Sequence, residues 1–198
     1  MSAFDKLRDS VTPKATPEQR AEARRKAMAA AKGGDWLSMI LEHHQRIEAA
    51  FAEAKRASSR EARHAALKQL GGVLTGHSIA EESVIYPALA EAGDKGDAEH
   101  GYHEQIEAKM HMARLEKLDP MSEDAVKLLA DIEAAVAHHM YQEEGDWLVD
   151  LHEKASAHEQ SELTERYREE FERYMGGDQA PPGSREPPRT FEREAPLH

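Results

Sequence analysis

Two histidine–glutamate pairs with the same spacing are the strongest chemical signal in the sequence. Glu81 follows His77 by four residues, and Glu143 follows His139 by four residues. Because residues four apart stack on one face of an α-helix, each pair would present an imidazole beside a carboxylate. Both pairs lie among apolar residues at helical spacing, so both are predicted to face a protein interior. Imidazole and carboxylate groups are donors that bind transition metals.

Two further histidines stand alone on the segments that alternate with these pairs. The stretch HQRIE begins at His44, and the similar stretch HEQIE begins at His103. Each histidine lies three or four residues from apolar residues such as Ile40 and Ile106, which predicts a place on the apolar face of its helix. The chain is therefore predicted to consist of two tandem helical hairpins. Each hairpin offers one lone histidine and one histidine–glutamate pair.

Four imidazoles and two carboxylates facing one core predict a metal centre, because buried carboxylates without partners strongly destabilise a fold. Nitrogen and oxygen donors without sulfur favour iron or manganese, and zinc fits less specifically. If both glutamates bridge two octahedral ions and an oxide or hydroxide also bridges them, about two coordination positions stay open. Open positions on a redox-active pair predict a small ligand such as dioxygen, peroxide or nitric oxide. The predicted ligands are His44, His77, Glu81, His103, His139 and Glu143.

Other polar residues close to these positions have two interpretations. They are either additional ligands or neighbours that orient the imidazoles by hydrogen bonds, and a solvated surface position is the alternative for each. Tyr86 and Tyr141 are candidates for hydrogen bonds to a metal-bound molecule. The candidates for additional ligands or supporting side chains are Glu48, Glu107, His100, Glu82 and Glu144.

Composition limits the class of protein further. The chain has 198 residues and no cysteine, which excludes disulfides, iron–sulfur clusters and cysteine nucleophiles. A net charge of -12 argues against nucleic-acid binding. No apolar run is long enough to span a membrane, and the first ten residues lack the apolar segment of a signal peptide. We expect a soluble cytoplasmic protein, and the sequence indicates no particular protein partner.

Helical periodicity places all these residues on an all-α, up-down-up-down four-helix bundle. The four helices are predicted over about 35–58, 60–92 and 97–118 and from 122 onward, with an extra helix at each end. The predicted divisions are a mobile arm over 1–15, an N-terminal helix over 16–34, the bundle over 35–155, a mostly polar C-terminal helix over 156–175 and a Pro-rich disordered tail over 176–198.

With this pattern the sequence resembles the hemerythrin-like, or HHE cation-binding, domains over about residues 35 to 155. The resemblance implies a four-helix bundle with a non-haem di-iron centre, and therefore two iron ions with a bridging oxide or hydroxide. The pattern is similar to that of a bacterial subgroup with two units of His followed by His-x-x-x-Glu. The matching residues are His44, His77, Glu81, His103, His139 and Glu143.

The classical oxygen carriers of this family differ from the present sequence on the third helix. They carry two histidines there, four residues apart, whereas the position four before His103 is Glu99. The resemblance therefore implies a non-haem iron protein that is not a simple reversible oxygen carrier.

Three functional hypotheses remain open from the sequence. In the first, the protein binds or turns over dioxygen, peroxide or nitric oxide; as an enzyme it would be a di-iron oxidoreductase, with catalase-like activity as one form. In the second, it is an iron or oxygen sensor, or an iron-storage module, with a bundle stabilised by metal. In the third, the bundle is structural only. A ferritin-like centre would need paired Glu-x-x-His motifs, and only Glu61 and His64 match.

Overall fold

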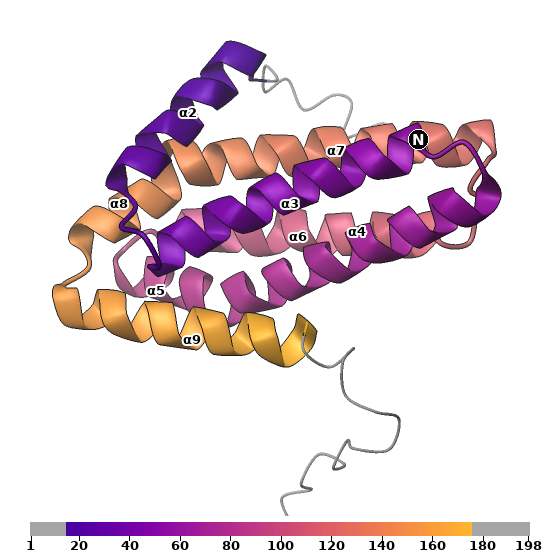
Figure 1. Cartoon of the computed structure of the whole chain (residues 1–198). Coiled ribbons are helices and arrows are strands. Elements are labelled where there is room, and N and C mark those ends of the chain that lie inside the picture. Colours follow the sequence, from indigo (N-terminus) through magenta and orange to yellow (C-terminus); the bar gives the residue numbers. More distant parts are fainter. Residues whose placement is uncertain (1–14, 176–198) are drawn as a thin grey trace, which may run out of the picture.

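The computed structural model describes residues 15–175, which form an all-α bundle of the predicted kind (Figure 1). No strand occurs within these residues, and none of their helices is long and apolar enough to cross a membrane. The predicted arm and tail lie outside the described residues, except for Ala15. The four long helices are α3 (Trp36–Arg56), α4 (Arg60–Ala80), α6 (Lys95–Leu115) and α7 (Glu123–Gln142).

The four long helices close into a ring of contacts. Helix α3 packs against α4 and α7, and α6 packs against the same two helices. Their starts follow capping residues in the sequence: the side chains of Asp35, Ser59 and Ser122 each accept a hydrogen bond from a backbone N–H in the first turn. The turn before α6 contains Gly93 at a φ of 105°, a conformation that favours glycine. Local chemistry therefore fixes the helix ends that the bundle requires.

Two of the long helices change to a π-helical turn where the predicted carboxylates occur. Helix α4 continues into η1 (Glu81–Ile85) and then α5 (Tyr86–Glu91). Helix α7 continues into η2 (Glu143–Trp147) and then α8 (Leu148–Lys154). Periodicity alone predicted uninterrupted helices here. A π-helical turn shifts the register of the side chains that follow it and is frequent at functional sites, so the sequence repeat is also a repeat in backbone geometry.

Two outer helices flank the bundle, and Figure 1 shows α2 above and α9 below the long helices in that view. Helix α2 (Pro17–Ala30) starts at a capping box formed by Thr16 and Gln19, and it packs against η2 and α8. Helix α9 (Ala157–Met175) packs against α3 and α4. The sequence suggested a mostly polar C-terminal helix, yet Leu163, Tyr167 and Phe171 form a buried stripe at four-residue steps.

The apolar core is divided by a layer of buried polar residues. On α3, Leu41 belongs to one apolar cluster and Ile47 to the other, with His44 between them. On α4, Val73 and Ala80 belong to different clusters in the same way, with His77 between them. The polar layer therefore crosses the middle of the bundle, with packed apolar side chains on both sides that exclude bulk water.

Substitution of Phe51 by Ala tests the contribution of the second apolar cluster. Phe51 is 1% exposed in that cluster, so we expect its truncation to lower the free energy of unfolding by about 3–5 kcal/mol. Urea denaturation followed by circular dichroism measures this loss. Met28→Ala is the control, because Met28 is 56% exposed and should change stability by less than about 0.5 kcal/mol. Equal effects of the two substitutions would contradict the assignment of Phe51 to the core.

Candidate metal centre

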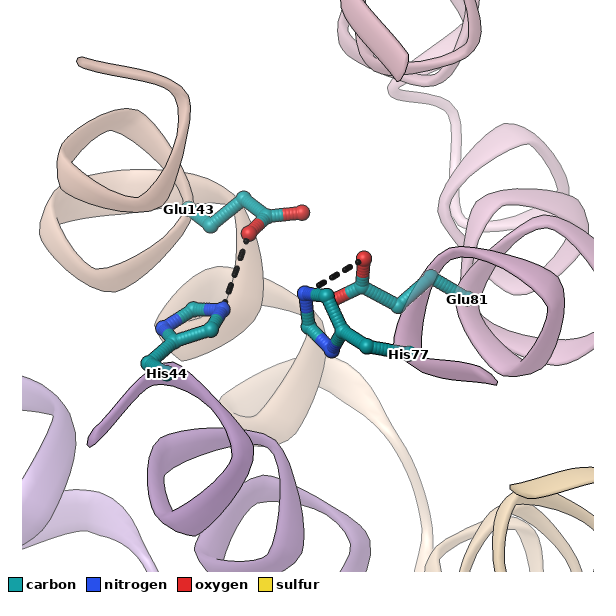
Figure 2. A group of neighbouring side chains, drawn as sticks. All are labelled: His44, His77, Glu81 and Glu143. Carbon is teal, nitrogen blue, oxygen red and sulfur yellow. Dashed lines mark ion pairs between the residues drawn. The ribbon is translucent and has the colours of Figure 1, made fainter. Parts of the chain in front are cut away.

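Four buried side chains from separate helical segments converge in the polar layer (Figure 2). They are His44 on α3, His77 on α4, Glu81 at the start of η1 and Glu143 at the start of η2. One nitrogen or oxygen atom of each lies within 4.8 Å of the corresponding atoms of the others. His44 Nε2 is 3.3 Å from Glu143 Oε2, and His77 Nε2 is 3.2 Å from Glu81 Oε2. Three residues of the two predicted histidine–glutamate pairs are thus brought together with the lone histidine His44.

Three atoms of this cluster are buried without a hydrogen-bond partner among residues 15–175. They are His44 Nε2, Glu81 Oε1 and Glu143 Oε2. His44 Nε2 and Glu143 Oε2 approach each other, but not in hydrogen-bonding geometry. An unpaired buried polar group costs about 1–3 kcal/mol, and native proteins contain few of them. A cation among these atoms would satisfy all three, so the donor set fits a metal ion.

His139 extends the cluster on the other side of Glu143. Its Nε2 lies 3.3 Å from Glu143 Oε1, and the imidazole is 7% exposed. Glu143 therefore directs one carboxylate oxygen toward His44 and the other toward His139. Both oxygens of this carboxylate therefore lie beside an imidazole nitrogen.

The third long helix contributes Gln105 to the centre, and the expectation that His103 faces the interior is wrong. His103 is exposed, and Ile106, which suggested its orientation, is 51% exposed. The inward face of α6 instead carries Ala98, Gly101 and Gln105. The Gln105 amide nitrogen donates to Glu81 Oε2 at 2.7 Å. The stripe of residues at 98, 101, 105, 112 and 115 was the sequence signal for this face.

Tyr86 fills the space that Gly101 leaves open. A Cβ atom at position 101 would lie 2.8 Å from Tyr86 Cζ, so any larger residue there would displace the phenol ring. Tyr86 Oη lies 3.1 Å from both Glu143 Oε1 and His139 Nε2, and it accepts a hydrogen bond from Gln105 Nε2 at 2.7 Å. Burial and the nearby Glu143 carboxylate raise the pKa of Tyr86 well above its usual value. The phenol is therefore protonated and donates to Glu143.

The imidazoles of the centre share one feature: a partner outside the cluster contacts Nδ1 while Nε2 faces a carboxylate. A ligand histidine commonly donates its second ring N–H to such a partner, which fixes the tautomer and the ring orientation. Nε2 then keeps the lone pair that a metal needs. The pairs are His44 with Glu144 at 2.7 Å, His77 with Tyr167 at 3.3 Å and His139 with Glu104 at 2.8 Å.

The partner of His44 is held in turn by helix α2. Arg24 donates to both oxygens of Glu144, at 3.1 Å and 2.7 Å, and to Glu48 at 2.8 Å. Burial raises the pKa of Glu144, but hydrogen bonds from His44 and Arg24 outweigh it and lower the pKa below the usual value. Glu144 therefore supports His44. Glu48 is half exposed and lies outside the cluster.

Without a metal, protons take over part of the charge balance of the cluster. Burial alone would lower the pKa of His44, but Glu143 and Glu144 raise it to about 9. Burial and the charge of Glu143 raise the pKa of Glu81 well above its usual value. Burial and protonated His44 lower the pKa of His77 well below its usual value. A charged imidazole beside one ionised and one neutral carboxylate is the arrangement that a cation would replace.

Three other candidates from the sequence lie away from the four clustered side chains. Glu82 accepts a hydrogen bond from Lys109 at 2.5 Å. His100 is half exposed, with its Nε2 3.2 Å from Glu104 Oε1. Glu107 is half-buried on α6 and is not part of the cluster. Tyr167 and Gln105, by contrast, contact the centre and were missed. Tyr167 lies outside the repeated motifs, and Gln105 lies within the HEQIE stretch, where His103 was expected to be the inward residue.

Comparison with known proteins identifies a family for the bundle. Residues 36–151 match the family described as the hemerythrin HHE cation binding domain. A curated relative, the DNA nickase of Nostoc sp. (strain PCC 7120), is 30% identical over 131 residues, which are 65% of this chain and 35% of the relative. The chain thus spans about a third of that protein. No solved structure gives a significant match. Membership of the bacterial subgroup stays a prediction.

Substitution of Gly101 by Ala tests the position of Tyr86. The added methyl group would collide with the phenol ring, so we expect a loss of about 1–3 kcal/mol in the free energy of unfolding. Gly96→Ala on the same helix is the matched control, because a Cβ there meets no atom within 4 Å. The measurement is the difference in urea midpoint between the two variants. If Gly101→Ala is as stable as Gly96→Ala, Tyr86 does not occupy this space.

Proposed function

The chain belongs to the hemerythrin HHE cation-binding family, and on that premise we propose that it holds two non-haem iron ions that bind or react with dioxygen, peroxide or nitric oxide. The observation that carries the proposal is the set of unpartnered buried atoms on His44, Glu81 and Glu143. A cation among these atoms would satisfy all three of them.

The donor chemistry supports iron. Mixed imidazole and carboxylate ligands without sulfur suit iron and manganese, and zinc binds them with less selectivity. His44, His77, Glu81 and Glu143 would hold one ion. His139 and the second oxygen of Glu143 would contribute to the other, with two further oxygen atoms close by. These are Tyr86 Oη and the unpartnered Gln105 Oε1.

The surroundings of the centre support small ligands. Iron, when bound, would supply the redox chemistry for such ligands. The chain supplies the phenol proton of Tyr86 at Glu143, the fixed tautomers of three histidines and a core that excludes bulk water. A surface cavity of about 300 Å³ between α2, α3 and α7 reaches Glu144, the partner of His44. Molecules of the size of dioxygen, nitric oxide or peroxide fit this setting, and a catalase-like oxidoreductase is the enzymatic form of the proposal.

Metal content is the first test, with His77→Ala as the variant. Protein reconstituted anaerobically with ferrous iron should contain about two iron ions per chain by elemental analysis. His77→Ala removes a donor of the cluster and should lose at least one of them. His103→Ala is the control: because His103 is exposed, its removal should leave the iron content unchanged. Wild-type protein that takes up no iron would overturn the proposal. Equal losses in the two variants would instead place His103 at the centre.

A second candidate function, iron or oxygen sensing, is favoured by the charge balance of the cluster. Removal of metal leaves two carboxylates facing each other in the core, with Glu81 forced toward its neutral form by Glu143. Loss of metal would therefore weaken the fold itself, which is the property that a sensor needs. An iron-storage module would instead take up iron well beyond the capacity of the cluster.

Chelation of the metal tests the sensing hypothesis. A ligand present at 100 times its dissociation constant stabilises a folded protein by about 2.7 kcal/mol, so removal should lower Tm by roughly 5–10 °C in a domain of this size. The measurement is thermal melting with and without chelator, set beside peroxide consumption. A large shift without turnover favours sensing. Turnover with a negligible shift favours the oxidoreductase.

The activity of the Nostoc relative is a separate matter. That protein is named a DNA nickase, and this chain covers 35% of it. A net charge of -12 opposes binding to a polyanion, so DNA nicking is not proposed for this chain.

A further inference from the structure

The C-terminal helix reaches the metal centre although it lies outside the region that matches the family. The match ends at residue 151, whereas α9 spans Ala157–Met175. Helix α9 packs along α3 and α4 and buries Tyr167 completely. The Tyr167 hydroxyl lies 3.3 Å from His77 Nδ1 and 2.9 Å from His43 Nδ1. A helix outside the matched family region therefore contacts a histidine of the cluster.

Counting protons gives these two hydrogen bonds a direction. His77 directs Nε2 toward Glu81, so a cation there would take the Nε2 lone pair and leave the ring proton on Nδ1. That N–H then donates to Tyr167 Oη. The phenol has one proton of its own, and it donates this proton to Nδ1 of His43. His43 Nδ1, at 2.9 Å from Tyr167 Oη, is the ring nitrogen placed to accept this proton.

His43 is itself fixed by the same helix. Its ring stacks on Phe171 with the two ring centroids 3.7 Å apart, and it is 6% exposed. Tyr167 and Phe171 lie four residues apart on α9 and therefore contact His43 together. The acceptor of the phenol proton cannot rotate away, which keeps the phenol oxygen turned toward His77.

We propose that Tyr167 is a positioning residue of the metal centre: its hydroxyl holds His77 in the tautomer and orientation that direct Nε2 toward the metal. This inference rests on the proposed metal binding. It assigns α9 a role in the centre beyond packing, because the hydroxyl makes the hydrogen bonds with His77 and His43. Tyr167→Phe removes that single atom and keeps the ring that fills the core.

Metal titration of wild-type protein and Tyr167→Phe tests the proposal. Metal-free full-length protein is titrated anaerobically with ferrous iron, and in parallel with cobalt(II), whose visible spectrum reports ligand geometry. We expect Tyr167→Phe to bind about 10–100-fold more weakly, as for other partners of ligand histidines, and to change the cobalt spectrum. Leu163→Ala is the matched control: Leu163 is buried on α9, so its truncation loosens the packing of that helix and leaves Tyr167 and His43 unchanged. It should keep the wild-type cobalt spectrum.

The outcomes separate this inference from the proposed function. Wild-type protein that binds neither ion contradicts metal binding itself, and the inference with it. Wild-type protein that binds while Tyr167→Phe binds equally well, with the same cobalt spectrum, overturns the role of Tyr167 alone. Equal weakening in Tyr167→Phe and Leu163→Ala, in proportion to their losses in melting temperature, also overturns it, because docking of α9 would then be the cause. Melting of the metal-free variants provides that comparison.

Discussion

The structure depends on one unfavourable contact: two carboxylates, those of Glu81 and Glu143, face one another in a dry core. Both side chains are fully buried, and each retains an oxygen without a hydrogen bond among the described residues. Such a pair is stable only if positive charge lies beside the two groups or one of them takes up a proton, as the raised pKa of Glu81 indicates. Protonated His44 and His139 provide the positive charge in the metal-free protein, where each carries a raised pKa because carboxylates surround it despite its burial. The same geometry serves a metal, which explains why the apolar core is split into two clusters around it.

The Nδ1 atoms of the histidines connect the centre to residues outside it, and these contacts fix the orientation of each ring. Glu144 fixes His44 and is fixed by Arg24, which gives helix α2 its main polar anchor to the bundle. Apart from that contact, α2 buries only the small side chains of Ala23 and Ala27. Helix α9 is anchored differently, by a buried stripe that includes Tyr167. Two helices outside the matched family region are thus joined to the centre by side chains that contact its histidines or their partners, so residues 15–175 form one packed structure.

Much of the metal centre could be predicted from the sequence, because the spacing of residues along a helix determines which face each side chain occupies. The four-residue steps from His77 to Glu81 and from His139 to Glu143 place each pair on one face, whatever the rest of the fold does. The third helix was harder, because polar residues occur on all its faces and periodicity alone does not choose among them. Gly101 determines which face of α6 lies inward. Tyr86 packs against the backbone at Gly101, so Gln105 on the same face points inward and His103 points outward. The π-helical turns and the role of Tyr167 depend on tertiary contacts that no local pattern records.

The departure of α6 from the repeat has a consequence for the centre. The sequence repeat predicts a site with approximate twofold symmetry. The two carboxylates and the two π-helical turns follow this symmetry. The remaining donors do not, because the inward position of α3 is the imidazole of His44, whereas that of α6 is the amide of Gln105 beside the phenol of Tyr86. An amide and a neutral phenol are weaker donors than an imidazole. Two ions in this centre would therefore be inequivalent: the one between His44 and His77 would be held more tightly, and the one beside His139 would have the more exchangeable surroundings, where a small ligand would find its place.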